Sequence, residues 1–214
     1  MSGTNISREA NNILPLSIEK KSVSIAFKEW QFRGVTKDMG IASACCELCD
    51  QEKLRYQFQI QNKYTRNKLW VGSSCIFKFS IEVFNELGLL LDNSEAKRHL
   101  SALTKELQQT ACLSALSSLA DNEESGILKT ALQSYKEKGY LSPKQASVVF
   151  WRLKEHNIEY NPSFFKISLG RTKYKQDLAA MDSWRVYVFW DALTSDQRKI
   201  AQSLGHKVPA TSTR

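Results

Sequence analysis

Alternating hydrophobic and polar residues mark the first third of the chain. The segment 54–72 reads LRYQFQIQNKYTRNKLWVG, in which aromatic and aliphatic residues alternate with polar and cationic ones. Alternation places one set of side chains on each face of a strand, and the polar stretch from Asn62 to Asn67 supplies a turn. This pattern predicts a β-hairpin. The run SVSIAFKEWQF at 22–32 also alternates and predicts another strand.

Helical spacing of apolar residues dominates the middle of the chain. After Asn93 or Ser94, either of which can cap a helix, leucines and alanines recur every three or four residues. Gly139 is a helix stop, and Ser142-Pro-Lys-Gln145 combines a cap, a proline at the first helical position and a capping-box glutamine. These patterns predict helices at 74–91, 94–120, 127–138 and 142–156.

The pattern changes again after residue 160. The segment 163–175, SFFKISLGRTKYK, is aromatic and basic and predicts a strand that leads into a loop. The segment 183–190, SWRVYVFW, is apolar and rich in β-branched residues, which favours a second strand. Thr194 opens a last helix, with Gln197 in the capping-box position, and Gly205 ends it.

The order of these elements predicts an α+β fold rather than a doubly wound one. We expect a cysteine-containing β-hairpin module packed on a mainly helical body that carries a small antiparallel β element. The predicted organisation is an N-terminal arm at 1–20, loose or docked, the hairpin module at 21–92, the helical body at 93–205 and a disordered tail at 206–214.

Charge and composition narrow the class of protein. The 214 residues include 30 Lys and Arg against 22 Asp and Glu, a formal net charge of +8. Such an excess favours polyanionic partners, because association releases counterions. No apolar run approaches the length of a membrane span, and the N-terminus lacks the apolar core of a signal peptide. We therefore expect a cytoplasmic protein without a membrane partner.

Cysteine spacing predicts a metal site. Cys46 and Cys49 form a CxxC turn, which presents two sulfurs to one point, and Cys75 follows the hairpin. An odd total of five cysteines argues against a disulfide framework and favours metal ligation or buried thiols. The expected cofactor is a structural Zn²⁺, with Cys46, Cys49 and Cys75 as ligands. The alternative is that the three thiols pack the base of the hairpin without a metal.

The fourth zinc ligand stays open at this stage. In common zinc ribbons the returning cysteine has a partner about three residues on, but that position is Lys78. The chain offers four other candidates: Asp38, Cys45, His99 and Cys112.

Two clusters of cations are candidate nucleic-acid contacts. The hairpin-tip cluster consists of Lys63, Tyr64, Arg66 and Lys68. A narrow hairpin tip can follow a nucleic-acid backbone, and an aromatic ring there can stack on a base. The second basic cluster consists of Lys166, Arg171, Lys173 and Lys175 and suits contacts with phosphates. The alternatives are an ordinary solvated surface for the cations and packing against the hairpin for Tyr64.

No set of residues with catalytic spacing emerges from the sequence. The three histidines lie far apart, and neither a glycine-rich phosphate loop nor a hydrolase or metalloprotease motif is present. We therefore expect a protein that is not an enzyme. Scattered carboxylates could still assemble a metal-dependent nuclease, which remains a third hypothesis.

The segment CELCDQEKLRYQFQIQNKYTRNKLWVGSSCIFKF resembles the cysteine-containing part of small zinc-finger proteins carried by phages and plasmids. The shared pattern is a CxxC knuckle, an aromatic strand, a turn containing asparagine and a VGSxCI return. In size, charge and finger, the chain also resembles the large-subunit-like component of type IV CRISPR effector complexes. That resemblance implies a subunit that contacts guide RNA and reads a short motif in target DNA.

Charge, finger and hairpin together predict a non-enzymatic zinc-finger protein that binds DNA or RNA within a nucleoprotein complex. In the second hypothesis, the chain is a phage- or plasmid-encoded inhibitor that occludes such a complex. The positive charge counts against an inhibitor that mimics nucleic acid.

Overall fold

The computed structural model describes residues 7–210, and the chain divides into two compact units at Gln108 and Gln109. Each unit has its own hydrophobic core. The long helix α4 (Asn93–Asn122) runs through the boundary, so that Leu100 belongs to the first core and Leu116 to the second. Helices outnumber strands, and the strands form one small mixed sheet, which confirms the predicted α+β class.

The sheet of the N-terminal unit has four strands in the order β3-β2-β1-β4. Pairing is antiparallel from β1 to β2 and from β2 to β3, and parallel from β1 to β4. The strands are β1 (Trp30–Asp38), β2 (Tyr56–Asn62), β3 (Lys68–Val71) and β4 (Glu82–Val83). The predicted hairpin is confirmed as β2 and β3, with its turn between Asn62 and Lys68.

Alternation in the hairpin explains which face is buried. Phe58 pairs with Val71 and Ile60 with Leu69, and all four side chains are buried in the core. Phe32 of β1 pairs with Ile60 and packs edge-to-face on Phe58. The intervening glutamines point to the other face. The apolar face thus fixes the register, because a slip of one residue would expose the whole set.

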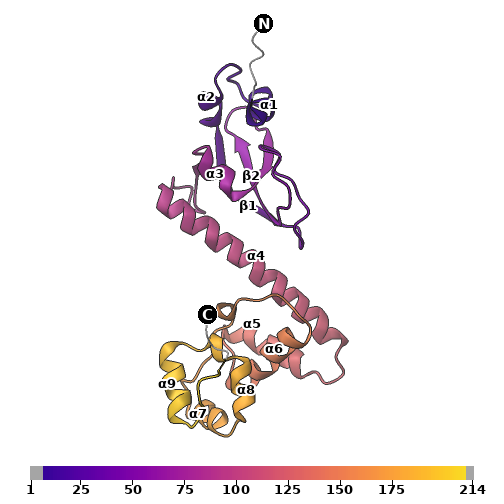
Figure 1. Ribbon diagram of the computed structural model, residues 1–214, viewed down its shortest axis with the longest axis vertical. Helices are drawn as coiled ribbons and strands as arrows, with labels where there is room; N and C mark the ends of the chain where they lie inside the picture. Colours follow the sequence, from indigo (N-terminus) through magenta and orange to yellow (C-terminus); the bar gives the residue numbers. More distant parts are fainter. Residues whose placement is uncertain (1–6, 211–214) are drawn as a thin grey trace. The chain divides into compact units, whose positions relative to one another are not determined.

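Three short helices complete this unit: α1 (Arg8–Ile13), α2 (Val23–Phe27) and α3 (Ser73–Lys78). Figure 1 shows α1 and α2 near one end of the sheet. A short 3-10 turn, η1 (Leu14–Leu16), follows α1. Ile13 is fully buried, so the part of the predicted arm at 7–20 is docked rather than loose. Residues 1–6 lie outside the described part of the chain.

The predicted strand at 22–32 is wrong in its first half. Residues 23–27 form α2, and β1 begins only at Trp30. Ala26 and Phe27 are consecutive and both buried, which a strand with one buried face cannot achieve. A single helical turn, closed by the bond from the Ala26 amide to the Ser22 carbonyl, buries both.

The predicted helix at 74–91 is also too long. Helix α3 ends at Lys78, and β4 follows. Ser80 has a φ of +50°, and the Ile81 amide bonds to the Ile76 carbonyl at 2.9 Å, which is the closing bond of a Schellman motif. Glycine usually takes this left-handed position, so a serine there gave no sequence signal.

The C-terminal unit is built from helices. They are α5 (Ile127–Lys138), α6 (Pro143–Glu155), α7 (Thr172–Ala179), α8 (Ser183–Val188) and α9 (Ser195–Ser203), with 3-10 turns η2 (Pro162–Phe164) and η3 (Trp190–Ala192). The predicted end of α5 at Gly139 is confirmed, as are the capping boxes at Ser142 and Thr194. The predicted cap of α4 is wrong, because Asp92 supplies it by accepting the Glu95 amide at 2.8 Å.

The small antiparallel β element predicted for this body is wrong. Residues 172–179 and 183–188 are the helices α7 and α8, and Ile167 makes only a single parallel bridge, to Leu141. In 183–190 the buried residues are Val186, Phe189 and Trp190, a spacing that fits a helix. A strand would have buried Trp184 together with Val186, but Trp184 is exposed.

The predicted disordered tail begins too early. His206 is buried, its amide bonds to the Ala201 carbonyl, and its Nε2 lies 2.8 Å from the Leu178 carbonyl. The residue therefore ties the end of α9 to the end of α7. Residues 211–214 lie outside the described part of the chain. Between residues 7 and 210, no helix is both long and apolar enough to cross a membrane.

Candidate metal centre and basic surfaces

A tight turn presents the first two cysteines. The Asp50 amide bonds to the Cys46 carbonyl, and the Cys46 amide bonds to the Gln51 carbonyl, each at 2.9 Å. Asp50 takes a left-handed backbone with φ of +59°. Glu47 attaches this turn to the edge of the hairpin, because its amide and its carboxylate bond to the backbone of Trp70. The knuckle and the hairpin therefore form one hydrogen-bonded piece.

The third cysteine, Cys75, lies in the first turn of α3. The Cys75 amide bonds to the carbonyl of Gly72, the residue that precedes the helix. The Cys75 sulfur lies 3.6 Å from the Cys46 sulfur and 3.2 Å from the Cys49 sulfur. All three sulfurs lie within 4.8 Å of one another. The predicted cluster is confirmed, and these three thiols could hold a metal ion.

The site favours a thiolate at Cys46. The hydrogen bond from Cys75 lowers the pKa of Cys46 to about 5, with further help from the backbone amides of Gly72, Cys49 and Leu48, against the cost of burial. Conversely, hydrogen bonding to Cys46, burial and hydrogen bonding to Cys49 raise the pKa of Cys75. Backbone amides directed at a sulfur stabilise its anion, which is the form that binds metals.

Lys78 occupies the position three residues after Cys75, where common zinc ribbons have their fourth ligand. Lys78 follows Cys75 by one helical turn, and its ammonium lies 2.8 Å from a carboxylate oxygen of Glu9 in α1. The hydrogen bond to Glu9 raises the pKa of Lys78. A protonated ammonium has no lone pair to give to a metal, so Lys78 is not the fourth ligand.

None of the four fourth-ligand candidates joins the cluster in residues 7–210. Asp38 is held by Arg55 at 3.0 Å, and Cys45 is exposed. His99 lies on α4, where its buried Nε2 has no hydrogen-bond partner among the described atoms. Cys112 is buried in the core of the C-terminal unit, where burial raises its pKa to about 11. The cluster of described residues therefore offers three ligands.

The hairpin turn is held by a buried carboxylate that the sequence analysis did not single out. Asn62 accepts the amides of Tyr64 and Thr65 through Oδ1, and it donates through Nδ2 to Glu29 at 2.8 Å. Glu29 also accepts the backbone amides of Ile18 and Glu19, each at 2.8 Å. One carboxylate thus joins the docked N-terminal segment to the turn. In the sequence, Glu29 is one of several polar residues in the segment 22–32 and directly follows Lys28, so nothing there marks it as buried.

The structure separates the members of the hairpin-tip cluster. The Lys63 ammonium lies 2.8 Å from Glu82 and 2.9 Å from the Lys28 carbonyl, so its charge is already neutralised. Arg66 and Lys68 are exposed, and Tyr64 is 65% exposed. The tyrosine therefore does not pack into the hairpin. Tyr64, Arg66 and Lys68 are the members of this cluster that face solvent.

The second basic cluster lies in the C-terminal unit, with Lys166 and Arg171 on the loop before α7 and Lys173 and Lys175 in the helix itself. Arg171 precedes the helix, and its guanidinium carbon lies 5.6 Å from the centre of the Tyr174 ring. Lys173 and Lys175 lie in the first turns of α7 and are exposed, as is Lys166. All four cations are exposed, although the buried residues Ile167 and Leu169 lie between the first two along the chain.

Comparison of the chain with protein-family models, with curated proteins and with solved structures gives no match.

Proposed function

We propose that this chain is a non-enzymatic nucleic-acid-binding protein whose hairpin is braced by a structural Zn²⁺ at Cys46, Cys49 and Cys75. The observation that carries the proposal is the construction of the hairpin. Its base adjoins a cluster of three thiols, and its tip presents Arg66 and Lys68 to solvent. A rigid element with exposed cations suits a polyanion better than a small substrate.

The ligand set favours zinc over a harder cation. Thiolates are soft ligands, and a CxxC turn with a distant third cysteine is typical of structural zinc sites. Binding would displace the protons of the thiols, because thiolate is the form that binds metals. The described residues supply three ligands, so water or a group from a partner would take the fourth position.

Nucleic acid would contact the tip through two kinds of interaction. Arg66 and Lys68 would bind phosphates, and Tyr64 would stack on an unpaired base. The exposed cations Lys166, Arg171, Lys173 and Lys175 would hold a second stretch of backbone. The overall charge of +8 would speed the encounter.

The specific form of this proposal is a subunit of a nucleoprotein complex that contacts guide RNA or target DNA. It is supported by the resemblance of residues 45–79 to phage and plasmid zinc fingers and by the general resemblance to a type IV CRISPR subunit. Binding tests with single-stranded RNA, single-stranded DNA and duplex DNA would show which of these partners the chain prefers.

The test of the proposal compares two double variants by fluorescence anisotropy across a salt series. Arg66→Ala with Lys68→Ala should weaken binding of a labelled oligonucleotide. The slope of log affinity against log salt concentration should also become shallower, by the amount expected for the loss of about two phosphate contacts. A matched control, Lys105→Ala with Lys154→Ala, removes two exposed cations elsewhere and should have little effect. An equal loss of affinity in both double variants would mean that only the overall charge of the protein matters, and it would contradict a binding site at the hairpin tip.

A further inference from the structure

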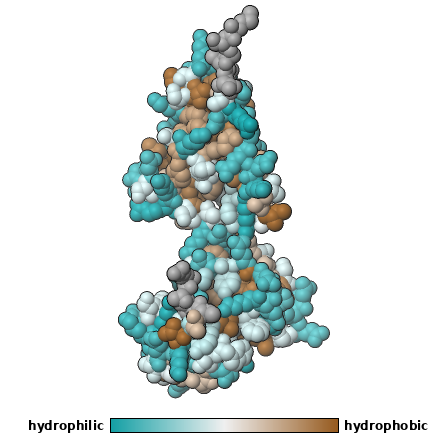
Figure 2. Space-filling view, in the orientation of Figure 1, coloured by the Kyte–Doolittle hydropathy of each residue, from teal (hydrophilic) through white to brown (hydrophobic). Residues whose placement is uncertain are grey.

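Large hydrophobic side chains are exposed to solvent in two surface features of this chain. Within the described residues, several exposed large hydrophobic side chains fall into two groups, Leu87, Leu89 and Leu90 in the N-terminal unit and Ile127, Trp151 and Trp184 in the C-terminal unit. Figure 2 shows hydrophobic residues, in brown, at the surface of both units. Grouped apolar exposure marks interaction sites, whereas single exposed residues are ordinary.

The first feature is a leucine loop, residues 85–91, between β4 and α4. Asn85 Oδ1 accepts the amides of Leu87 and Leu89 at 3.0 and 2.9 Å, and the Asn85 amide bonds to the Leu89 carbonyl. Gly88 supplies the left-handed residue of the turn, with φ of +74°. The loop is therefore built to hold Leu87, Leu89 and Leu90 outward, with Leu87 83% exposed, whereas Leu91 packs against the core.

Acidic residues flank the leucine loop. Glu86 and Asp92 are both exposed, one at each side of the leucines. Asp92 is also the cap of α4, which fixes its position at the end of the loop. An apolar knob with negative charge on either side is therefore presented to solvent.

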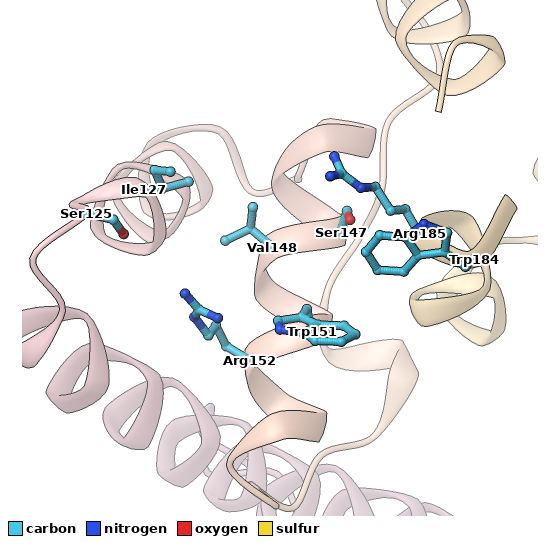
Figure 3. Close-up of a pocket in the computed structure, with 8 residues that line it drawn as sticks. All are labelled: Ser125, Ile127, Ser147, Val148, Trp151, Arg152, Trp184 and Arg185. Carbon is cyan, nitrogen blue, oxygen red and sulfur yellow. The ribbon is translucent and has the colours of Figure 1, made fainter. Parts of the chain in front are cut away.

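The second feature is a tryptophan groove between α5, α6 and α8. Its cavity of about 220 Å³ is lined by Ser125, Ile127, Ser147, Val148, Trp151, Arg152, Trp184 and Arg185. Figure 3 shows Ile127 of α5 facing Val148 of α6, with Trp184 of α8 beside Trp151. The two indole rings meet edge to face, 5.6 Å apart, although they are 43% and 51% exposed.

The groove continues along α5 and α6. A neighbouring cavity of about 260 Å³ shares Ile127 and Val148 with the first and reaches Lys144. The floor is apolar, and charged residues stand at the rim. Arg185 is exposed, and the carboxylate of Asp182 is 4.0 Å away. Lys144 is also exposed, but Asp177 neutralises it at 2.8 Å, which leaves Arg185 as the rim cation without a close ion pair among the described residues.

We propose that the leucine loop of one copy of this chain docks into the tryptophan groove of a second copy. The leucines would cover Trp151, Trp184 and Ile127, and the acidic flanks of the loop would meet Arg185 at the rim of the groove. Burial of apolar area supplies the affinity, and opposite charges set the orientation. This inference is independent of the metal and of nucleic-acid binding.

A stacked nucleobase is a less suitable occupant. The Arg185 guanidinium carbon lies 5.2 Å from the centre of the Trp184 ring, so a cation already occupies one ring face. Arg152 is neutralised by Glu123 and Glu155 and offers little to a phosphate. The apolar lining fits aliphatic side chains better.

Because the loop and the groove are different surfaces, the contact is heterologous. Each copy carries one of each, so association does not end at a dimer unless a ring closes. The average mass of the nuclease-treated wild-type chain should therefore rise with protein concentration in light scattering after size exclusion. A wild-type chain that stays monomeric at every concentration would overturn the proposal.

Each surface can be removed separately. Leu87→Ser with Leu90→Ser should abolish association, as should Trp184→Ala or, if that variant misfolds by circular dichroism, Arg185→Glu. Ile41→Ser removes an equally exposed apolar side chain elsewhere and should associate like wild type. Association that persists in both the loop and the groove variants would overturn the proposal.

Mixing the variants gives the sharpest result. A loop variant retains its groove and a groove variant retains its loop, so the mixture should form a one-to-one complex that cannot grow. Neither variant should associate alone. A mixture that remains monomeric, or a groove that binds single-stranded RNA in competition with self-association, would contradict docking of the loop.

Discussion

Glu29 shows how one residue positions the proposed binding surface. Its carboxylate is buried and accepts three hydrogen bonds, from Asn62 and from the backbone of the docked N-terminal segment. Burial opposes ionisation, but the bonds from Asn62, Glu19 and Ile18 outweigh it and lower the pKa of Glu29. The turn that carries Tyr64 and Arg66 thus depends on a charge located at its base.

Replacing Glu29 with Gln should destabilise the N-terminal unit by about 1.5–3 kcal/mol, the usual range for hydrogen bonds to a charged group. A carboxylate whose folded pKa is lowered contributes stability above its unfolded pKa of about 4.3, and this contribution is lost as pH falls through the folded value. Urea unfolding at several pH values checks both effects. The variant should show a weaker acid dependence than wild type, and the exposed Glu106→Gln should show none of these changes.

Cys49→Ser should release the metal and lower the melting temperature, since the remaining two thiols cannot hold zinc tightly. Elemental analysis together with a thermal melt provides the measurement. Cys45→Ser is the matched control, because Cys45 is adjacent but exposed and outside the cluster. Wild-type protein purified without any metal would refute the zinc site.

At the scale of elements, capping residues predicted the ends of helices better than residue composition predicted helix or strand. The ends of α5, α6 and α9 follow from Gly139, Ser142 and Thr194, each of which acts through local hydrogen bonds or a local dihedral angle. By contrast, the β-branched and aromatic run 183–190 forms α8, because packing in the core outweighs the weak preference of its residues for strands.

Gly139→Ala should cost about 1 kcal/mol of stability in the C-terminal unit, because the φ of +72° disfavours any side chain. Open space surrounds the position that the new methyl group would occupy, so the cost is conformational alone. Gly170→Ala is the control, since Gly170 has no such dihedral angle and only an ordinary contact with Ser168. Chemical denaturation should show a lower free energy of unfolding for Gly139→Ala and little change for Gly170→Ala.

At the scale of the whole molecule, the chain has two cores and an uneven distribution of chemistry. The cysteine cluster and the hairpin tip lie in the N-terminal unit, whereas the second basic cluster and the tryptophan groove lie in the C-terminal unit. Binding of a metal to the folded state stabilises whatever unfolds together with its ligands. The effect should therefore be confined largely to one unit.

Removing the metal with a chelator should accelerate hydrogen exchange in β2, β3 and α3, and leave α5 and α6 little changed. Peptide-resolved mass spectrometry measures both regions in one experiment. A uniform increase along the chain would mean that the two cores unfold as a single cooperative unit.

The sequence by itself determined the hairpin, the CxxC turn and the helices with strong caps, because each depends on residues that are close along the chain. Alternation set the register of β2 and β3, and the CxxC spacing placed two sulfurs together. Only the tertiary structure decided that Lys63 is neutralised by Glu82, that α8 is a helix and that Trp151 and Trp184 share a groove. These features arise between residues that are distant in sequence, where packing and burial outweigh local preference.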